Sequence, residues 1–407
     1  MRPLTFLRSN LPWLSAGFLL TFLSSFGQTF FISLFADGIR TDFGLSHGEW
    51  GLIYSLGTAT SALVMVWAGG LTDRFRARGI GTFVLVLLAF ACLFMALNPV
   101  WWLLPLVIFL LRFSGQGMLS HIAVVAMARW FTAARGKALS FATLGFASGE
   151  ALLPLIFVSL MALFDWQNLW LLTAAIALLG IPALRLLLTT ERTPQSITAS
   201  SSSVGMLSRH WARLEAMRHW LFWLMIPALL GPSAFNTAFF FHQVHFAEIK
   251  HISHLQLVAY FPFYTGVSII AMVLSGLALD RFGTPRLIPF MQLPMIAAFT
   301  IFAYASDGAA LFLGFVFLGL TSGFNTTLPA AFWAEFYGTR FIGSIKAMAA
   351  AIMVLGSAIG PGITGYGIDH GIGLERQYLL VAVYFAFSTI CMTIGVIRAR
   401  PMLPAAP

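Results

Sequence analysis

The sequence has 407 residues, of which 59% are hydrophobic and 9% are charged. A soluble globular domain is about half apolar and about a quarter charged, so this composition excludes a protein that is surrounded mainly by water. The net charge of +9 would suit a nucleic-acid binder if the chain were soluble, but apolar runs of membrane-spanning length recur along the whole sequence. We therefore predict a membrane protein whose surroundings are the lipid bilayer, with no nucleic-acid partner.

Apolar runs bounded by charged residues, Gly and Pro predict about twelve transmembrane helices, and so an all-α integral membrane fold. The first run follows Arg2 and Arg8, is too long for a signal peptide and lacks a small-residue cleavage site, so we expect it to remain as the first helix. The expected helices are 13–36, 49–70, 80–97, 101–128, 138–163, 168–188, 220–247, 255–279, 286–305, 309–334, 342–367 and 377–398.

The longest polar interruption runs from Thr189 to Arg218, includes the serine run Ser200–Ser203, and ends in a basic amphipathic stretch. A polar segment of this kind between two sets of six helices is typical of a linker. We predict an N-terminal six-helix bundle at 1–188, a cytoplasmic central linker at 189–218, and a C-terminal six-helix bundle at 219–407.

The distribution of cations predicts the orientation. Of the 23 Lys and Arg residues, 19 lie in the two termini, the linker and the alternate loops that share their side of the membrane. The other four are Arg40, Arg112, Lys250 and Arg376. By the positive-inside rule, both termini and the linker are cytoplasmic, and we expect a multi-pass protein of the bacterial inner membrane.

An internal repeat appears at a constant offset of 207 residues, where Asp73-Arg74-Phe75 recurs as Asp280-Arg281-Phe282. A parallel repeat of this kind predicts two halves related by an axis along the membrane normal. The same offset pairs Ser46-His47 with Ser253-His254, Gly69 with Gly276, Gly136 with Gly343, Gly149 with Gly356, and Pro154 with Pro361.

Two of the repeated positions predict helix starts. Ser46 with Glu49, and Ser253 with Gln256, have the spacing of a capping box, in which each side chain accepts a hydrogen bond from a backbone N–H that the helix leaves unpaired. We assign these four residues a structural role only.

The loops after expected helices 2 and 8 read Gly69-Gly70-Leu71-Thr72-Asp73-Arg74-Phe75 and Gly276-Leu277-Ala278-Leu279-Asp280-Arg281-Phe282-Gly283. Both resemble the Gly-x-x-x-Asp-Arg-x-Gly loop signature of the major facilitator superfamily. With twelve helices, a six-plus-six repeat and a long central loop, the resemblance spans essentially the whole chain. It implies a secondary transporter that works by alternating access, and we expect a monomer without a cofactor or metal.

The same loops are candidates for a cytoplasmic gate, in which Asp73 would face the start of helix 11 and Asp280 that of helix 5. An aspartate is favourable at the positive N-terminal end of a helix. The alternative is that the loops only fix the topology. The gating candidates are Gly70, Asp73, Arg74, Gly276, Asp280 and Arg281.

Expected helix 4 carries the segment from Arg112 to Gly117, which looks like the superfamily pattern Arg-x-x-Gln-Gly-x-Gly with the Gln displaced by one position. The following segments 128–131 and 135–138 are similar to the monocarboxylate and oxalate transporter branches. Helix 1 has Gly27-Gln28-Thr29-Phe30 where monocarboxylate carriers have an acidic-Gly-Gly-aromatic motif, so the branch stays open. Helix 11, rather than helix 5, carries an antiporter-like Gly360-Pro361 element, and we infer no drug–proton exchange from it.

Two ionisable residues lie at the expected middle of the membrane. Arg112 is roughly 16 Å from the outer end of helix 4, and Glu150 is roughly 18 Å from the inner end of helix 5. They are predicted either to form a structural salt bridge, or to serve transport, with Arg112 binding an anionic substrate and Glu150 carrying a proton. A planar guanidinium suits a carboxylate well.

The resemblance implies that helices 1, 4, 7 and 10 line a central cavity. Gln28, Gln116, Asn236 and Asn325 on these helices are therefore candidates to complete a substrate site with Arg112, or else they form interhelical hydrogen bonds. The preferred function is proton-coupled transport of a small organic anion, such as a monocarboxylate. The alternative is export of amphipathic or drug-like compounds by proton antiport. A channel or a membrane-embedded enzyme finds no support in the sequence.

Overall fold

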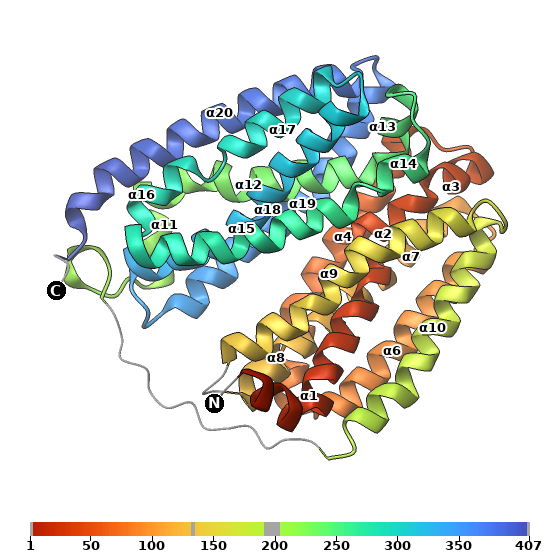
Figure 1. The fold of residues 1–407 in the computed structure, drawn as a ribbon, viewed down its shortest axis with the longest axis horizontal. Helices are drawn as coiled ribbons and strands as arrows, with labels where there is room; N and C mark the ends of the chain where they lie inside the picture. Colours follow the sequence, from red (N-terminus) through yellow and green to blue (C-terminus); the bar gives the residue numbers. More distant parts are fainter. Residues whose placement is uncertain (1–2, 132–134, 191–203, 405–407) are drawn as a thin grey trace. The chain divides into compact units, whose positions relative to one another are not determined.

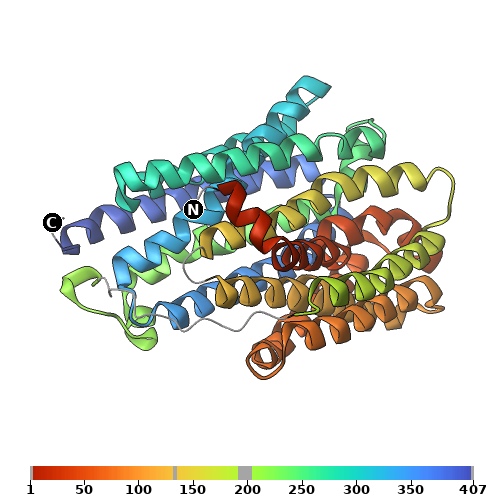
Figure 2. The ribbon, with the colours of Figure 1, turned by 60° about the horizontal axis from the view of Figure 1, so that its bottom comes forward.

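The computed structural model describes residues 3–131, 135–190 and 204–404. In these ranges the regular structure is entirely helical (Figure 2). Eleven helices are long and apolar enough to cross a membrane, or twelve if the bent pair Arg8–Gly27 and Thr29–Phe43 forms one span. The prediction of an all-α membrane protein with about twelve transmembrane helices is therefore confirmed.

The chain forms two compact units. Unit 1 comprises Met1–Ala199 together with Phe240–His245 and Ser253–Val258, and unit 2 comprises the rest of the chain. The division of the sequence into two bundles at 1–188 and 219–407 with a linker at 189–218 stays a prediction, and residues 191–203 of that linker lie outside the described ranges.

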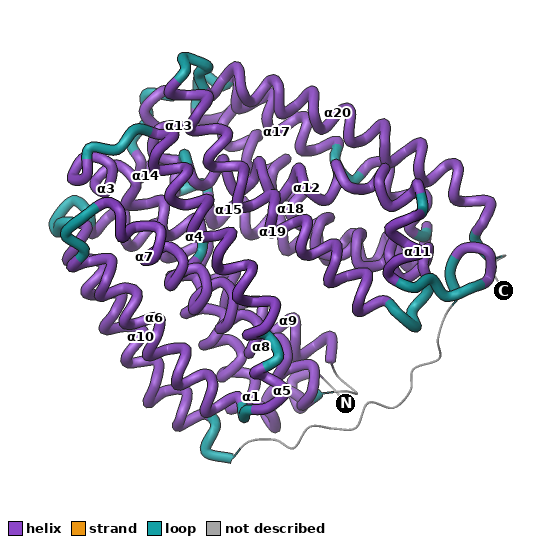
Figure 3. The backbone as a smooth tube through the Cα atoms, turned by 180° about the vertical axis from the view of Figure 1, so that it is seen from behind, coloured by secondary structure: helices purple, strands orange, loops and turns teal. Residues whose placement is uncertain are grey.

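The first part of the chain supplies the larger share of unit 1 (Figure 1). Its helices are α1 (Pro3–Ser24), η1 (Ser25–Gly27), α2 (Thr29–Ile32), η2 (Ser33–Phe35), α3 (Ala36–Phe43), α4 (His47–Ala68), α5 (Leu71–Arg74), α6 (Ala77–Leu97), η3 (Trp101–Leu103), α7 (Leu104–Leu111), the π-helix η4 (Arg112–Leu119), α8 (Ser120–Trp130), α9 (Arg135–Leu160) and α10 (Trp166–Leu187). Figure 3 shows α6 and α10 side by side, and an added Cβ at Gly81 of α6 would lie 2.8 Å from Leu184 Cδ2 of α10.

The second part of the chain supplies unit 2 and the two short segments of unit 1. Its helices are η6 (Met206–Ser208), α11 (Arg213–Arg218), α12 (Trp220–Phe241), α13 (Gln243–Ile249), α14 (His254–Val258), α15 (Phe261–Phe282), α16 (Thr284–Leu287), η7 (Ile288–Phe290), α17 (Leu293–Tyr304), α18 (Gly308–Tyr337), α19 (Ile342–Asp369), α20 (Leu374–Ala399) and η8 (Arg400–Met402). Helices α15 and α18 pack closely, since a Cβ at Gly323 would lie 2.4 Å from Ser268 O.

Both predicted capping boxes are confirmed. Before α4, Ser46 N–H donates to Glu49 Oε2 at 2.8 Å, and Glu49 N–H donates to Ser46 Oγ at 3.1 Å. Before α14, Ser253 N–H donates to Gln256 Oε1 at 2.8 Å, and Gln256 N–H donates to Ser253 Oγ at 3.2 Å. The repeat therefore preserves the same way of starting a helix in both halves of the sequence.

Candidate functional site

The first membrane helix is broken, although the sequence predicts one continuous helix at 13–36. Helix η1 ends at Gly27, Gln28 has an extended backbone with φ −86° and ψ 154°, and α2 begins at Thr29. The two arms are bent by 49°. A break leaves backbone carbonyls without donors from the same helix, and inside a bilayer these carbonyls need partners from elsewhere.

Arg112 provides one of these partners. Its Nη1 donates to Gly27 O at 3.1 Å and to Thr29 Oγ1 at 3.4 Å. Its side chain is 1% exposed, and its Cζ lies 5.5 Å from the centre of the Tyr54 ring. The Tyr54 and Thr29 hydroxyls are hydrogen-bonded to each other at 2.5 Å. A buried cation thus contacts two neutral oxygens at the helix break.

The Arg112 guanidinium also has a donor that the contacts at the helix break do not use. Arg112 Nε is buried, and no described residue accepts a hydrogen bond from it. Leaving a buried charged donor unpaired costs more than leaving a neutral one, so the arrangement favours an additional acceptor. A carboxylate oxygen would satisfy both the charge and the geometry of this donor.

The fourth predicted span is also irregular at this point. Arg112 opens the π-helix η4, a wider turn that is often found at functional sites. The backbone of η4 touches the break directly, because a Cβ at Gly115 would lie 2.6 Å from Gly27 Cα, and a Cβ at Gly27 would lie 2.1 Å from Leu111 O. Both positions therefore require glycine in this packing.

Glu150 lies on α9, which contacts the same break. A Cβ at the preceding Gly149 would lie 2.0 Å from Ser25 Oγ of η1, and one at Gly145 would lie 2.1 Å from Phe18 O of α1. The Glu150 side chain is half-buried. The structure thus places Arg112 and Glu150 on two different helices that both pack against the broken first helix.

The remaining candidates divide between the units. In unit 1, Gln28 forms the break itself and Gln116 lies within η4, and both are half-buried. In unit 2, Asn236 lies on α12 and Asn325 on α18, and both are again half-buried. Asn236 Oδ1 is buried, and within the described ranges no group donates a hydrogen bond to it.

Packing explains one of the repeated glycine pairs. In unit 1, Gly149 lets α9 approach the first helix at Ser25, and in unit 2 its counterpart Gly356 lets α19 approach α12, since a Cβ there would lie 2.7 Å from Leu230 O. The repeat at this position therefore conserves a close helix contact in each unit.

The two loops that carry the gating candidates are each held by helices of their own unit. In unit 1, Arg129 Nη1 donates to Thr72 O at 2.8 Å. In unit 2, Glu335 Oε2 accepts a hydrogen bond from Thr284 N–H at 3.2 Å. Of the gating candidates, Gly70, Arg74, Asp280 and Arg281 are exposed, Gly276 is half-buried, and the Asp73 side chain lies outside the described part of the structure. A Cβ at Gly276 would meet nothing within 4 Å.

Sequence reasoning missed four residues of the site: Gly27, Thr29, Tyr54 and Gly115. Gly27 and Gly115 directly precede the candidates Gln28 and Gln116, and this pairing of Gly with an amide residue was the available signal. No such signal marked Thr29 and Tyr54, because their contacts with each other and with Arg112 depend on how α4 packs against the helix break. Among the described residues, no three His, Cys, Asp or Glu side chains are placed to hold a metal ion.

A family model described as the Major Facilitator Superfamily matches residues 17–361. The chain belongs to this superfamily. It is therefore a multi-pass membrane transporter of small molecules rather than an enzyme. No curated protein sequence matches the chain.

Solved transporters share the fold of this superfamily member over nearly its whole length. A bacterial homolog of the human lysosomal transporter Spinster, in an inward-facing and unoccupied conformation, is 16% identical with a TM-score of 0.74, over 97% of this chain and 98% of that one. The nucleoside transporter NupG is 17% identical with a TM-score of 0.70, over 97% and 99% of the two chains. At these identities the similarity establishes the fold.

Proposed function

We propose that this superfamily member is a secondary active transporter that moves a small organic anion together with protons by alternating access. The observation that carries the proposal is the buried Arg112 guanidinium, which contacts two neutral oxygens and whose Nε has no acceptor among the described residues. Charged groups within a membrane are costly and mark transport pathways by default. A monocarboxylate-like substrate would supply the acceptor that this guanidinium lacks.

Glu150 is the proposed proton carrier. It lies next to Gly149, where α9 contacts η1, and Arg112 donates to Gly27 O at the end of the same η1. A carboxylate near a cation stays ionised, whereas an anion bound to Arg112 would offset the guanidinium charge and favour protonation of Glu150. Binding of the anion and of the proton would then support each other, as a symporter requires.

The amide residues are proposed to orient the substrate. Gln28 and Gln116 adjoin the Arg112 contacts in unit 1, and in unit 2 the buried Asn236 Oδ1 has no donor within the described ranges. Asn325 on α18 is assigned to the same group by its half-buried position within a span. Amides donate as well as accept, so they suit the polar groups of a small solute better than hydrophobic residues do.

A flux screen in proteoliposomes tests the function. The substrates are small carboxylates, a lipophilic cation and, because one solved relative transports nucleosides, a nucleoside. We expect carboxylate uptake that an inward proton gradient accelerates. Flux of the lipophilic cation driven by proton exchange, without carboxylate flux, would overturn the proposal in favour of an exporter of amphipathic compounds.

We propose further that the protein acts as a monomer in the bacterial inner membrane, with both termini and the linker in the cytoplasm. The orientation is supported by the positive-inside rule, because 19 of the 23 cations fall in the termini, the linker and the alternate loops expected on their side. A topology reporter fused after Met206 should read as cytoplasmic, and an external reading would refute this orientation.

We propose that Asp73 and Asp280 act in the cytoplasmic gate with Gly70, Arg74, Gly276 and Arg281. Because a carboxylate at a helix start contributes about 1 kcal/mol, Asp280→Asn and Asp73→Asn should each slow transport roughly threefold to fivefold without altering thermal stability. Transport counterflow in proteoliposomes provides the rate. Asp37→Asn, at an exposed position in α3, is the charge-matched control. Unchanged rates in both loop variants would leave these loops with a topological role only.

A further inference from the structure

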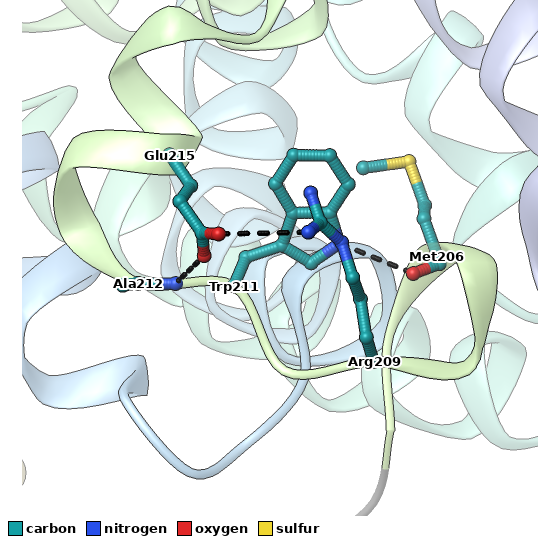
Figure 4. A network of polar contacts seen from close by, with 5 residues as sticks. All are labelled: Met206, Arg209, Trp211, Ala212 and Glu215. Atoms are coloured by element: carbon teal, nitrogen blue, oxygen red, sulfur yellow. Dashed lines mark hydrogen bonds and ion pairs between the residues drawn. The ribbon is translucent and has the colours of Figure 1, made fainter.

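The described end of the linker, Gly205–His219, folds into a compact element that we name the linker hook (Figure 4). Trp211 anchors it to unit 2. This side chain is 4% exposed, its backbone N–H donates to Tyr337 O at 3.0 Å, and its Nε1 donates to Met206 O at 3.1 Å. The hook closes on itself where Gly205 N–H donates to Arg209 O at 3.0 Å. It is therefore an ordered part of unit 2.

The polar network within the hook uses one of its three arginines. Arg209 Cζ lies 4.0 Å from the centre of the Trp211 ring, and its Nη1 lies 3.5 Å from Glu215 Oε1. Glu215 Oε2 also accepts a hydrogen bond from Ala212 N–H at 2.8 Å, as Figure 4 shows. Arg213 and Arg218 are exposed and take no part in this network.

Two leucines of the hook, Leu207 and Leu214, are exposed close in sequence to these arginines. Leu207 is 60% exposed and has a left-handed backbone with φ 57° and ψ 28°, a conformation that is unfavourable for leucine and easier for Gly or Asn. Leu214 is 63% exposed on α11, opposite the fully buried Ala216. A strained backbone at a leucine that is 60% exposed indicates a use for the side chain outside the hook.

Two tryptophans lie where the hook joins the candidate span Trp220–Phe241. Helix α12 starts directly after it, at the partly exposed Trp220, and Trp223 is 62% exposed while its Nε1 donates to Met217 O at 2.8 Å. Tryptophan is enriched where the hydrocarbon meets the headgroups. Helix α11, immediately before these residues, is thus placed beside lipid headgroups.

This end of unit 2 is strongly basic. Figure 1 shows α11, α16 and the C-terminal end of α20 gathered at the same end of the unit. The cations on the hook and on the neighbouring helix ends are Arg209, Arg213, Arg218, Arg281, Arg286, Arg340, Lys346, Arg398 and Arg400, and the acidic residues there are Glu215, Asp280 and Glu335. The charge of this surface complements an acidic membrane.

We propose that the linker hook binds acidic phospholipids, with Arg213 and Arg218 contacting the headgroup phosphates and Leu207 and Leu214 inserting among the acyl chains. Basic residues at a membrane surface attract anionic lipids, and adjacent apolar side chains add buried area. The inference is independent of the transported substrate.

The test measures binding of phosphatidylglycerol to the purified full-length protein by native mass spectrometry, with phosphatidylcholine as the neutral lipid. At about 1 kcal/mol for each charge, Arg213→Gln with Arg218→Gln should weaken the affinity for phosphatidylglycerol about 30-fold. The double variant Arg185→Gln with Arg376→Gln removes the same charge from exposed positions elsewhere and should bind normally. Equal losses in both double variants, or none in either, would overturn the proposal.

Leu207→Asn separates insertion from folding. Asparagine adopts the left-handed conformation readily, so thermal stability in detergent should be kept, while the affinity for phosphatidylglycerol should fall about fivefold. A destabilised variant with normal lipid affinity would show that Leu207 serves packing, and would contradict the insertion. Displacement of phosphatidylglycerol by equimolar soluble glycerol 3-phosphate would likewise contradict a lipid site, because it would leave the acyl chains without a role.

Discussion

Arg112→Gln is expected to weaken carboxylate binding about 100-fold, since removing one partner of a buried, hydrogen-bonded charge pair costs about 3 kcal/mol. The side chain is 1% exposed, and its Nε has no acceptor among the described residues, so a bound carboxylate would supply one. Binding to purified protein by calorimetry measures the change. Arg112→Lys keeps the charge but loses the planar donor pair, and should give an intermediate affinity.

A structural role for Arg112 predicts a different pattern. Its hydrogen bond to Gly27 O stabilises the break in the first helix, so Arg112→Gln would then lower thermal stability. If Arg112 and Glu150 form a structural charge pair, Glu150→Gln should also destabilise the protein, and the double neutral variant should recover. A well-folded Arg112→Gln protein with normal anion affinity would contradict the binding role.

Gly27→Ala is expected to destabilise the protein by about 3 kcal/mol or more. The added Cβ would lie 2.1 Å from Leu111 O, and a backbone oxygen cannot move aside as a flexible side chain can. The free energy of unfolding in mixed micelles measures the effect.

Gly266→Ala is the matched control for this substitution, because Gly266 lies inside α15 and a Cβ there would meet nothing within 4 Å. It should leave stability unchanged or raise it by up to about 1 kcal/mol, since alanine favours helix more than glycine does. Equal stability of Gly27→Ala and Gly266→Ala would show that the first and fourth spans do not need this close contact.

The fold was predictable because membrane spans follow from the lengths of apolar runs, which are local properties of the sequence. The capping boxes at Ser46 and Ser253 were predictable for the same reason, since each involves residues three positions apart. The break at Gln28 was not, because no proline marks it. The break depends on the close approach of Gly27 in η1 to Gly115 in η4. A tertiary contact of this kind leaves no periodic pattern in the sequence.

The candidate site was predictable in part. The depths expected for Arg112 and Glu150 rest on helix rise alone and stay predictions, whereas the structure places both residues on helices that contact the same break. The hydroxyls of Thr29 and Tyr54 were missed, since nothing in the sequence fixes the rotation of α4 relative to η4. The proposed lipid contact of Leu207 was not predictable either, because it rests on a left-handed backbone conformation that leucine rarely adopts.

The central claim is that anion binding at Arg112 and protonation of Glu150 are coupled, and proton uptake on binding tests it most directly. Calorimetric titration with the transported carboxylate, in two buffers of different ionisation enthalpy, gives the number of protons taken up for each anion bound. The account predicts about one proton for the wild-type protein at the pH of transport, and none for a well-folded Glu150→Gln variant that still binds the anion. Undiminished proton uptake in Glu150→Gln, or none in the wild-type protein, would contradict it.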